Sequence, residues 1–290
     1  MELFLAPDVC ANHTARGLQL HPPSQTTCGQ ADSTITGAML PQEQETVRLA
    51  APPPLDLHSQ ALFLDLDGTL VDFAARPEHV VAHPALRRLL TDLSRQMSGA
   101  VALVTGRTIA SADAVLGGAL VNVAGIHGLE RRSAASVVER AYNKCAPVDA
   151  ALAEAHALAA TLPIDIEDKG AALALHYRRA PEFAETARRL AVEIAQRHGL
   201  GMLEGNMVIE LKLGQRTKGH AVADFMASPT FNTRKPVALG DDVTDEDAFR
   251  AVNQRGGYAI LVGAERATAA RFRLASPEAV FTWLNAGLGR

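Results

Sequence analysis

The chain has 290 residues, which is enough for one large or two modest domains with a sizeable buried core. Hydrophobic residues make up 48% and charged residues 21%, as in ordinary soluble globular proteins, and the formal net charge is -4. This slightly acidic balance, with only 4% aromatic residues, provides neither the basic surface nor the aromatic platform of a nucleic-acid-binding protein. Three scattered cysteines, no apolar stretch of about 20 residues and no basic signal sequence favour a cytoplasmic protein that does not bind membranes.

The first part of the chain, residues 1–57, differs in composition from the rest. It is rich in Gln, Ser and Thr, contains Pro22-Pro23 and Pro52-Pro53-Pro54, and has no sustained hydrophobic periodicity. We therefore expect a disordered amino-terminal extension that contributes little to folding or turnover. On this prediction, a chain that begins near Leu55 keeps the melting temperature of the parent protein.

From residue 58 onward, apolar strands alternate with amphipathic helices. Strands are expected at 61–64, 100–104, 120–123 and 236–239, and helices at 84–97 and 109–116. Right-handed crossovers between such strands would give a parallel, doubly wound sheet. The pattern predicts an α/β core that comprises residues 58–144 and 212–290.

The middle of the chain, residues 145–211, has a different order of elements. Two helices and two tight hairpins are expected here, with helices at 148–161 and from Pro181 onward, and strands at 164–167, 172–177, 202–204 and 207–211. This is an α+β unit inserted into the α/β core. An insertion between catalytic elements is where a cap that covers the substrate would lie.

Two carboxylates, Asp65 and Asp67, directly follow the first core strand and precede Gly68. In an extended backbone, residues i and i+2 point to the same face, so both side chains can reach one small volume. They repel each other unless a cation or a shared proton offsets their charge. The pair favours catalysis with a divalent metal, although taken alone it could equally be an Asx turn or a helix cap.

Three further motifs follow in order. Thr105-Gly106-Arg107 ends the second strand, Lys218 opens a helical pattern, and Gly240-Asp241-Asp242-Val243-Thr244-Asp245-Glu246 follows a later strand. Together with the paired aspartates, this order resembles the four motifs of the haloacid dehalogenase superfamily. The resemblance implies a Rossmann-like parallel core with an inserted cap.

Segments within and near the insertion make this resemblance more specific. Gly125-Ile126-His127-Gly128, Glu167-Asp168-Lys169-Gly170 and Val208-Ile209-Glu210-Leu211-Lys212 are similar to bacterial trehalose-6-phosphate phosphatases. The similarity extends from about Ala61 to the carboxyl end. It implies a phosphatase of trehalose biosynthesis that acts on trehalose 6-phosphate.

The resemblance assigns a role to each core motif. Asp65 would be the nucleophile that forms an aspartyl phosphate, and Asp67 would be the general acid and then the general base. Thr105 would donate its hydroxyl to a phosphoryl oxygen, and Lys218 would offset charge beside the phosphoryl group. Mg²⁺ would be held by the Asp65 carboxylate, the Asp67 backbone carbonyl and Asp241.

The same resemblance implies that Arg107, Glu167, Lys169 and Glu210 bind the substrate. Charged groups make strong, directional hydrogen bonds to sugar hydroxyls. The alternative is that the charges on these hairpins only form a solvated face.

Several questions stay open at this point. Asp242 and Asp245 could each support the metal site or cap a helix, and a lone histidine such as His127 is more often structural than functional. The chain could instead act on another sugar phosphate, such as a sucrose or mannosylglycerate phosphate, or be a phosphomannomutase. A catalytically silent module that binds sugar phosphate is a third possibility, and the oligomeric state is not indicated.

Overall fold

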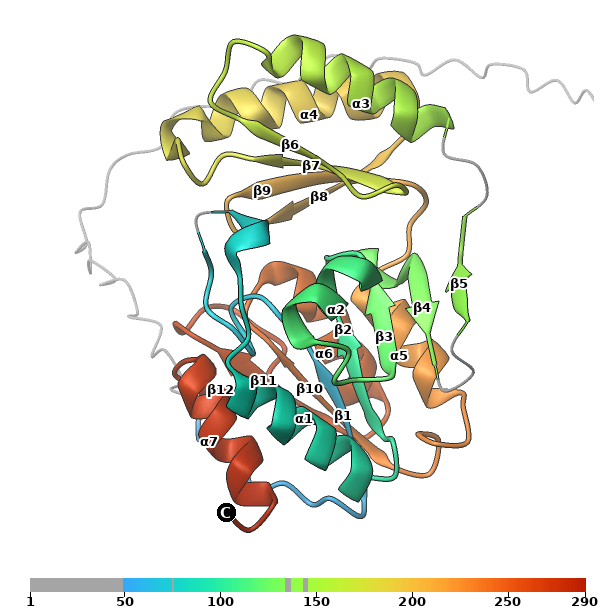
Figure 1. Ribbon diagram of the computed structural model, residues 1–290, viewed down its shortest axis with the longest axis vertical. Helices are drawn as coiled ribbons and strands as arrows, with labels where there is room; N and C mark the ends of the chain where they lie inside the picture. Colours follow the sequence, from blue (N-terminus) through green and yellow to red (C-terminus); the bar gives the residue numbers. More distant parts are fainter. Residues whose placement is uncertain (1–48, 75, 134–136, 143–145) are drawn as a thin grey trace, which may run out of the picture. The chain divides into compact units, whose positions relative to one another are not determined.

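The computed structural model describes residues 49–74, 76–133, 137–142 and 146–290 (Figure 1). Most of the expected amino-terminal extension, residues 1–48, therefore lies outside the described residues. The described part contains an eight-stranded, mainly parallel sheet and a separate four-stranded antiparallel sheet. The predicted α/β core with an α+β insertion is confirmed. None of the helices in these ranges is both long and apolar enough to span a bilayer.

The large sheet has the strand order β12-β11-β10-β1-β2-β3-β4-β5. Its parallel strands are β1 (Gln60–Leu64), β2 (Val101–Val104), β3 (Asn122–Gly125), β10 (Lys235–Gly240), β11 (Tyr258–Val262) and β12 (Phe272–Leu274). Every residue of β1, β2 and β11 is buried, because helices cover both faces of the sheet. Two short antiparallel strands, β4 (Glu130–Arg132) and β5 (Val138–Arg140), complete one edge.

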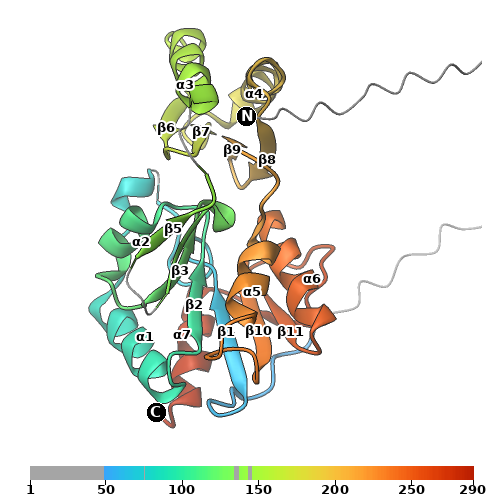
Figure 2. The ribbon, with the colours of Figure 1, turned by 90° about the vertical axis from the view of Figure 1, so that its right-hand side faces the viewer.

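Helices lie on both sides of this sheet. Figure 2 shows α1 (Pro84–Gln96), α2 (Ile109–Leu116) and α7 (Pro277–Gly287) on one side, and α5 (Lys218–Met226) and α6 (Glu246–Gln254) on the other. The helix predicted at 109–116 begins and ends at those residues. Thr108 fixes its start by accepting a hydrogen bond from Ser111 N, and Gly117 ends it in the left-handed conformation with φ 65°.

The inserted unit, which we call the cap, consists of one antiparallel sheet and two helices. Its elements are α3 (Ala146–Ala159), β6 (Asp165–Asp168), β7 (Ala172–His176), α4 (Ala184–His198), β8 (Gly201–Gly205) and β9 (Val208–Lys212). Strand alternation turns apolar side chains such as Leu173 and Leu211 toward the helices, where they form a separate apolar core. The opposite face of the cap sheet is turned toward the carboxyl ends of the core strands (Figure 1).

The structure differs from the expected boundary of the extension, because residues 49–57 contact the core. Leu55 is buried against α7, and Trp283 Nε1 in that helix donates a hydrogen bond to the Pro53 carbonyl at 2.9 Å. Ala50 pairs with strand β12. The proline-rich composition resembles that of a linker, but here the prolines belong to a segment that packs against the core.

Candidate active site

The functional side chains of the core follow the ends of three neighbouring strands. Asp65 follows β1, Thr105 follows β2 and Asp241 follows β10. These strands lie side by side in the order β10-β1-β2 and run parallel, so their carboxyl ends meet at one edge of the sheet. Asp65 N extends the ladder by donating to the Leu239 carbonyl at 3.0 Å, which fixes the backbone at this point.

A buried ion-pair network lies at this edge. Lys218, the first residue of α5, places its Nζ 2.7 Å from Asp65 Oδ1 and 2.7 Å from Asp245 Oδ1. All three residues are buried. Burial on its own would lower the pKa of Lys218, but Asp245 and Asp65 outweigh it and raise that pKa. The ammonium therefore stays charged beside the expected nucleophile.

Asp65, Asp241 and Asp245 form a carboxylate cluster in which one oxygen from each lies within 4.8 Å of the others. Burial, followed by the neighbouring Asp245, raises the pKa of Asp241 to about 7. Burial likewise raises the pKa of Asp65 well above its ordinary value, despite the nearby Lys218. Three carboxylates share one ammonium, so a hard divalent cation would stabilise their ionised forms. The cluster fits a metal ion of this kind.

The carboxylate of Asp67 turns away from this cluster and pairs with Arg107. Arg107 Nε and Nη2 each lie 2.7 Å from one Asp67 oxygen, in a bidentate arrangement. Arg107 Nη1 is held in turn by the Pro77 carbonyl and Ser111 Oγ. Arg107, expected to bind substrate, thus fixes the orientation of Asp67. Thr105 is buried beside this pair, where its hydroxyl accepts from the Arg107 backbone N–H at 3.2 Å.

Gly68 allows the two catalytic loops to approach each other. Its φ is 82°, and a Cβ at this position would lie 2.3 Å from Asp241 Oδ2 and 2.7 Å from the Phe73 ring. Only glycine adopts this backbone without strain and leaves room for the Asp241 carboxylate. The glycine that follows the paired aspartates is therefore a structural requirement of the site.

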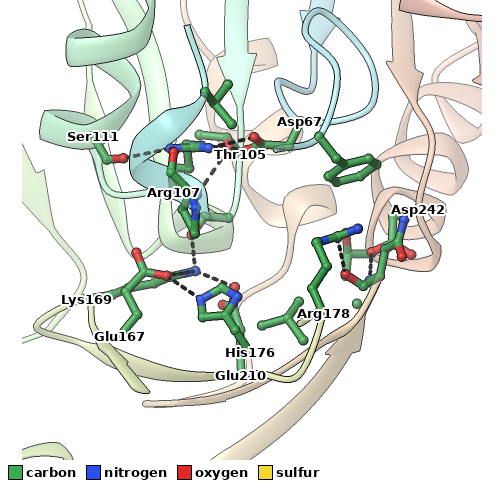
Figure 3. Close-up of a pocket in the computed structure, with 18 of the residues that line it drawn as sticks. Asp67, Thr105, Arg107, Ser111, Glu167, Lys169, His176, Arg178, Glu210 and Asp242 are labelled. Atoms are coloured by element: carbon green, nitrogen blue, oxygen red, sulfur yellow. Dashed lines mark hydrogen bonds and ion pairs between the residues drawn. The ribbon is translucent and has the colours of Figure 1, made fainter. Parts of the chain in front are cut away.

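Across the cavity, the cap sheet presents a row of alternating charges (Figure 3). Lys169 Nζ lies 2.5 Å from Glu210 Oε1 and donates to the Gly106 carbonyl of the core at 3.0 Å. Glu167 accepts from His176 Nε2 at 2.8 Å and lies 3.9 Å from Lys169. Lys169 and Glu210 are buried, so these charges are not a solvated hairpin face.

These charges stabilise one another. Burial would raise the pKa of Glu210, but Lys169 and His127 outweigh burial and lower it. Burial would lower the pKa of Lys169, but Glu210 and Glu167 raise it. The cap thus carries a preformed carboxylate–ammonium pair at the cavity wall, suited to hydrogen-bonding a polyhydroxylated ligand.

His127, which sequence reasoning left without a role, connects the core to this pair. Its Nε2 lies 3.0 Å from Glu210 Oε2, and among the described residues its Nδ1 has no partner. Burial outweighs Glu210 and lowers the pKa of His127, so the neutral ring donates from Nε2. Ile126 and His127 both adopt left-handed backbone, with φ of 47° and 54°. Nothing in a Gly-Ile-His-Gly sequence predicts that conformation for two bulky residues.

One cavity of about 480 Å³ joins the two sets of side chains. Its lining includes every predicted site residue: Asp65, Asp67, Thr105, Arg107, Glu167, Lys169, Glu210, Lys218 and Asp241. It also includes His176 and Arg178, to which the sequence analysis gave no role, and His127 and Asp242, whose roles it left open. Asp245, expected to be a helix cap or a second support for the metal site, pairs directly with Lys218 and belongs to the carboxylate cluster.

Comparison with known proteins agrees with this geometry. The trehalose-phosphatase family model matches residues 63–278, which include the strand-end motifs and the whole cap. A protein of Sinorhizobium fredii described as a probable trehalose-phosphate phosphatase is 42% identical over 213 residues, covering 72% of this chain and 79% of that protein. The trehalose-6-phosphate phosphatase of Escherichia coli is 37% identical over 226 residues, covering 77% of this chain and 85% of that protein.

A solved structure shares the fold. The crystal structure of a protein related to trehalose-6-phosphate phosphatase superimposes with a TM-score of 0.67 at 26% sequence identity. The match covers 79% of this chain and 96% of that one. Both the core and the cap therefore have counterparts in a solved structure.

Proposed function

Because this chain belongs to the trehalose-phosphatase family, we propose that it hydrolyses trehalose 6-phosphate to trehalose and inorganic phosphate. One observation carries the proposal: a single cavity joins a phosphoryl-transfer site in the core to a charged sugar-facing wall in the cap. A disaccharide phosphate needs both parts, since its phosphate and its distal sugar lie at opposite ends of the molecule.

The proposed reaction begins at Asp65. Its carboxylate oxygen attacks phosphorus, and the bond from phosphorus to the sugar 6-oxygen breaks as Asp67 gives that oxygen a proton. The product is an aspartyl phosphate and free trehalose. Asp67 then takes a proton from the water that attacks the same phosphorus, which releases phosphate and restores Asp65. Arg107 keeps the Asp67 carboxylate in place through its two 2.7 Å hydrogen bonds.

The remaining core groups stabilise charge. Lys218 already contacts Asp65 at 2.7 Å, so its ammonium lies next to the position where phosphoryl charge would accumulate. The Thr105 hydroxyl would donate to a phosphoryl oxygen. Mg²⁺ is the proposed cofactor, held by Asp65, Asp241 and the Asp67 backbone carbonyl, with Asp245 in the same cluster. When bound, it would neutralise the carboxylates and the phosphoryl oxygens and so lower their mutual repulsion.

In the cap, Glu167, Lys169 and Glu210 are proposed to hydrogen-bond the sugar hydroxyls. Their charged forms are favoured by mutual pairing, as the lowered pKa of Glu210 and the raised pKa of Lys169 indicate. A sugar that enters the cavity would exchange part of these contacts for its own hydroxyls. Selectivity for the sugar would therefore reside in the cap, and phosphate chemistry in the core.

A screen of phosphate release over a panel of sugar phosphates tests the proposal. The panel includes trehalose 6-phosphate, sucrose 6-phosphate, mannosylglycerate phosphate and glucose 6-phosphate, each at several concentrations with Mg²⁺. We expect kcat/KM for trehalose 6-phosphate to exceed the others by at least about tenfold, the equivalent of one good hydrogen bond. Preference for another ester would assign a different substrate, and binding without turnover of any ester would indicate a silent binding module.

A further inference from the structure

Asp242 directly follows Asp241, yet its carboxylate belongs to a different set of contacts. Asp242 Oδ1 accepts from the backbone N–H of Val243 at 2.7 Å, at the start of the short 3₁₀ helix η4 (Val243–Asp245). Asp242 Oδ2 accepts from the backbone N–H of Asn206 at 3.0 Å. Asn206 lies in the two-residue turn between β8 and β9, so this hydrogen bond joins the cap to the core.

The same turn has a second attachment to the core. Arg178 Nη2, on the cap, donates to the Asn206 carbonyl at 2.7 Å. The Arg178 guanidinium lies over the Phe73 ring, 4.6 Å from its centroid. Phe73 belongs to the loop that follows β1 and packs beside Gly68. The turn is therefore attached to both loops that carry the aspartates of the core, as Figure 3 shows for Arg178 and Asp242.

The close approach of the turn to Asp242 depends on small backbone groups. A Cβ at Gly205 would lie 2.9 Å from Asp242 Oδ2, so a larger residue would push the turn away from the core. In a two-residue hairpin, the N–H of the first turn residue has no partner in the strand ladder. Asp242 satisfies that donor. Asp242 Oδ1 caps η4 at Val243, while Oδ2 accepts from Asn206.

We propose that Asp242 and Asn206 form a clasp, by which we mean this one hydrogen bond, that positions the cap over the phosphoryl-transfer site. Asp242 is then a positioning residue for the cap and is not a metal ligand. Asn206 leads directly into β9, which carries Glu210 four residues later. Fixing the turn therefore fixes where Glu210 stands relative to Asp65. The inference deepens the proposed function and rests on it, since it assigns the clasp an effect on sugar binding.

Two variants break the clasp from opposite sides. Asn206→Pro removes the donating N–H together with the asparagine side chain, at a residue that does not share the positive φ of its neighbour Met207, 62°. Asp242→Asn keeps the side-chain shape and removes the charge of the acceptor. Asp247→Asn is the matched control, because Asp247 lies in the same acidic segment but is only partly buried and pairs with Arg250 one turn along α6.

The experiment measures kcat and KM for trehalose 6-phosphate and for p-nitrophenyl phosphate, together with the Mg²⁺ concentration that gives half-maximal activity. Each clasp variant should raise KM for trehalose 6-phosphate by about tenfold, the loss of one charge-assisted hydrogen bond. Turnover of p-nitrophenyl phosphate and the Mg²⁺ dependence should stay within about twofold of the parent. The double variant should be no worse than the more affected single variant, because both remove the same contact.

Three results would overturn the clasp. A raised Mg²⁺ requirement in Asp242→Asn with unchanged KM would place Asp242 in the metal site. Equal losses on both substrates would indicate general damage to the fold, and additive effects in the double variant would show that the two residues act independently. Failure of the proposed function can be distinguished from failure of the clasp. If the proposed function is wrong, the parent protein itself does not hydrolyse trehalose 6-phosphate. The same variants are then compared on the ester that the parent protein prefers.

Discussion

At Gly68, the loop that carries Asp65 lies so close to Asp241 that a methyl group would not fit between them. Gly68→Ala should cost about 1–2 kcal/mol in unfolding free energy from the left-handed backbone, and should also displace the Asp241 carboxylate. Gly118→Ala is the matched control, because Gly118 also has a positive φ, 69°, but an added methyl group there would meet no other atom within 4 Å among the described residues. Urea unfolding should show the backbone cost in both variants and a larger loss in Gly68→Ala, because only there does the added methyl group also meet Asp241 and Phe73, and only Gly68→Ala should lose phosphatase activity. Full activity in Gly68→Ala would contradict the close packing.

His127 makes a pH-dependent contribution to stability. Burial lowers its pKa in the folded protein, so between that value and about 6.5 the unfolded chain binds the proton more readily than the folded one. Stability should therefore fall as the pH is lowered from 7 to 5. His127→Gln keeps an N–H donor for Glu210 but does not titrate, so it should lose less stability than the parent over this range. Urea unfolding of both proteins at pH 7 and pH 5 measures the difference, and an equal fall in both would exclude His127 as its source.

Strand alternation in the cap explains how charged residues come to line a buried cavity. In β9, Ile209 and Leu211 face the cap helices, so Glu210 between them must face the core. Strand β6 lies beyond β7 in the same sheet, and because Glu167 pairs with Ala174 and Ala174 with Glu210, Glu167 is on the same side. The cap sheet thus has an apolar face toward the cap helices and a charged face toward the cavity.

Loss of these charges should affect the sugar and spare the phosphate chemistry. Lys169→Ala and Glu210→Ala should each lower kcat/KM for trehalose 6-phosphate by about one to two decades, corresponding to one charge-assisted hydrogen bond. Hydrolysis of p-nitrophenyl phosphate, which lacks the second sugar, should be much less affected. Glu185→Ala serves as the control, because this cap glutamate is exposed on α4. Equal losses on both substrates would point to damaged cap docking, and no loss would return these residues to a structural role.

The elements that the sequence predicted well are those with a strong local pattern. The helix 109–116 and the two cap hairpins were predictable because apolar periodicity and turn residues lie within a few positions of each other. Strands β4 and β5 were missed, since three-residue edge strands made largely of Glu and Arg carry no apolar alternation. Their charged side chains pair with residues whose positions cannot be predicted from the sequence, as Arg132 does with Asp113.

At the site, the motif residues could be predicted because the carboxyl ends of neighbouring parallel strands lie at the same edge of a sheet. For Asp242 and Asp245 the expected helix-cap role is confirmed, but their further contacts, and the contact of His127, could not be predicted, because each depends on a partner far away in the chain. Asp245 pairs with Lys218, His127 with Glu210, and Asp242 with the turn at Asn206. Only the tertiary fold brings these pairs together.

At the scale of the whole molecule, residues 49–57, which precede β1, pack against the core and belong to the folded unit. A chain that begins at Leu49 should keep the parent's melting temperature, which keeps the expectation made for residues 1–57 but limits it to residues 1–48. A chain that begins at His58 loses the buried Leu55 and the Trp283–Pro53 hydrogen bond, so it should melt on the order of 5 °C lower. Calorimetry of the two truncated chains makes the comparison. An equal melting temperature for both would show that residues 49–57 add nothing to stability.

The core and the cap are proposed to act as one enzyme, in which Asp65 carries out the chemistry with a metal ion held by the carboxylate cluster. The most direct measurement is phosphate release from trehalose 6-phosphate by the parent protein and by Asp65→Asn, with Mg²⁺ and after chelation by EDTA. The parent should release phosphate with Mg²⁺, stop after EDTA and recover when Mg²⁺ is added back, while folded Asp65→Asn should release none under any condition. Sustained turnover by Asp65→Asn, or parent activity that is indifferent to EDTA, would contradict the proposed mechanism.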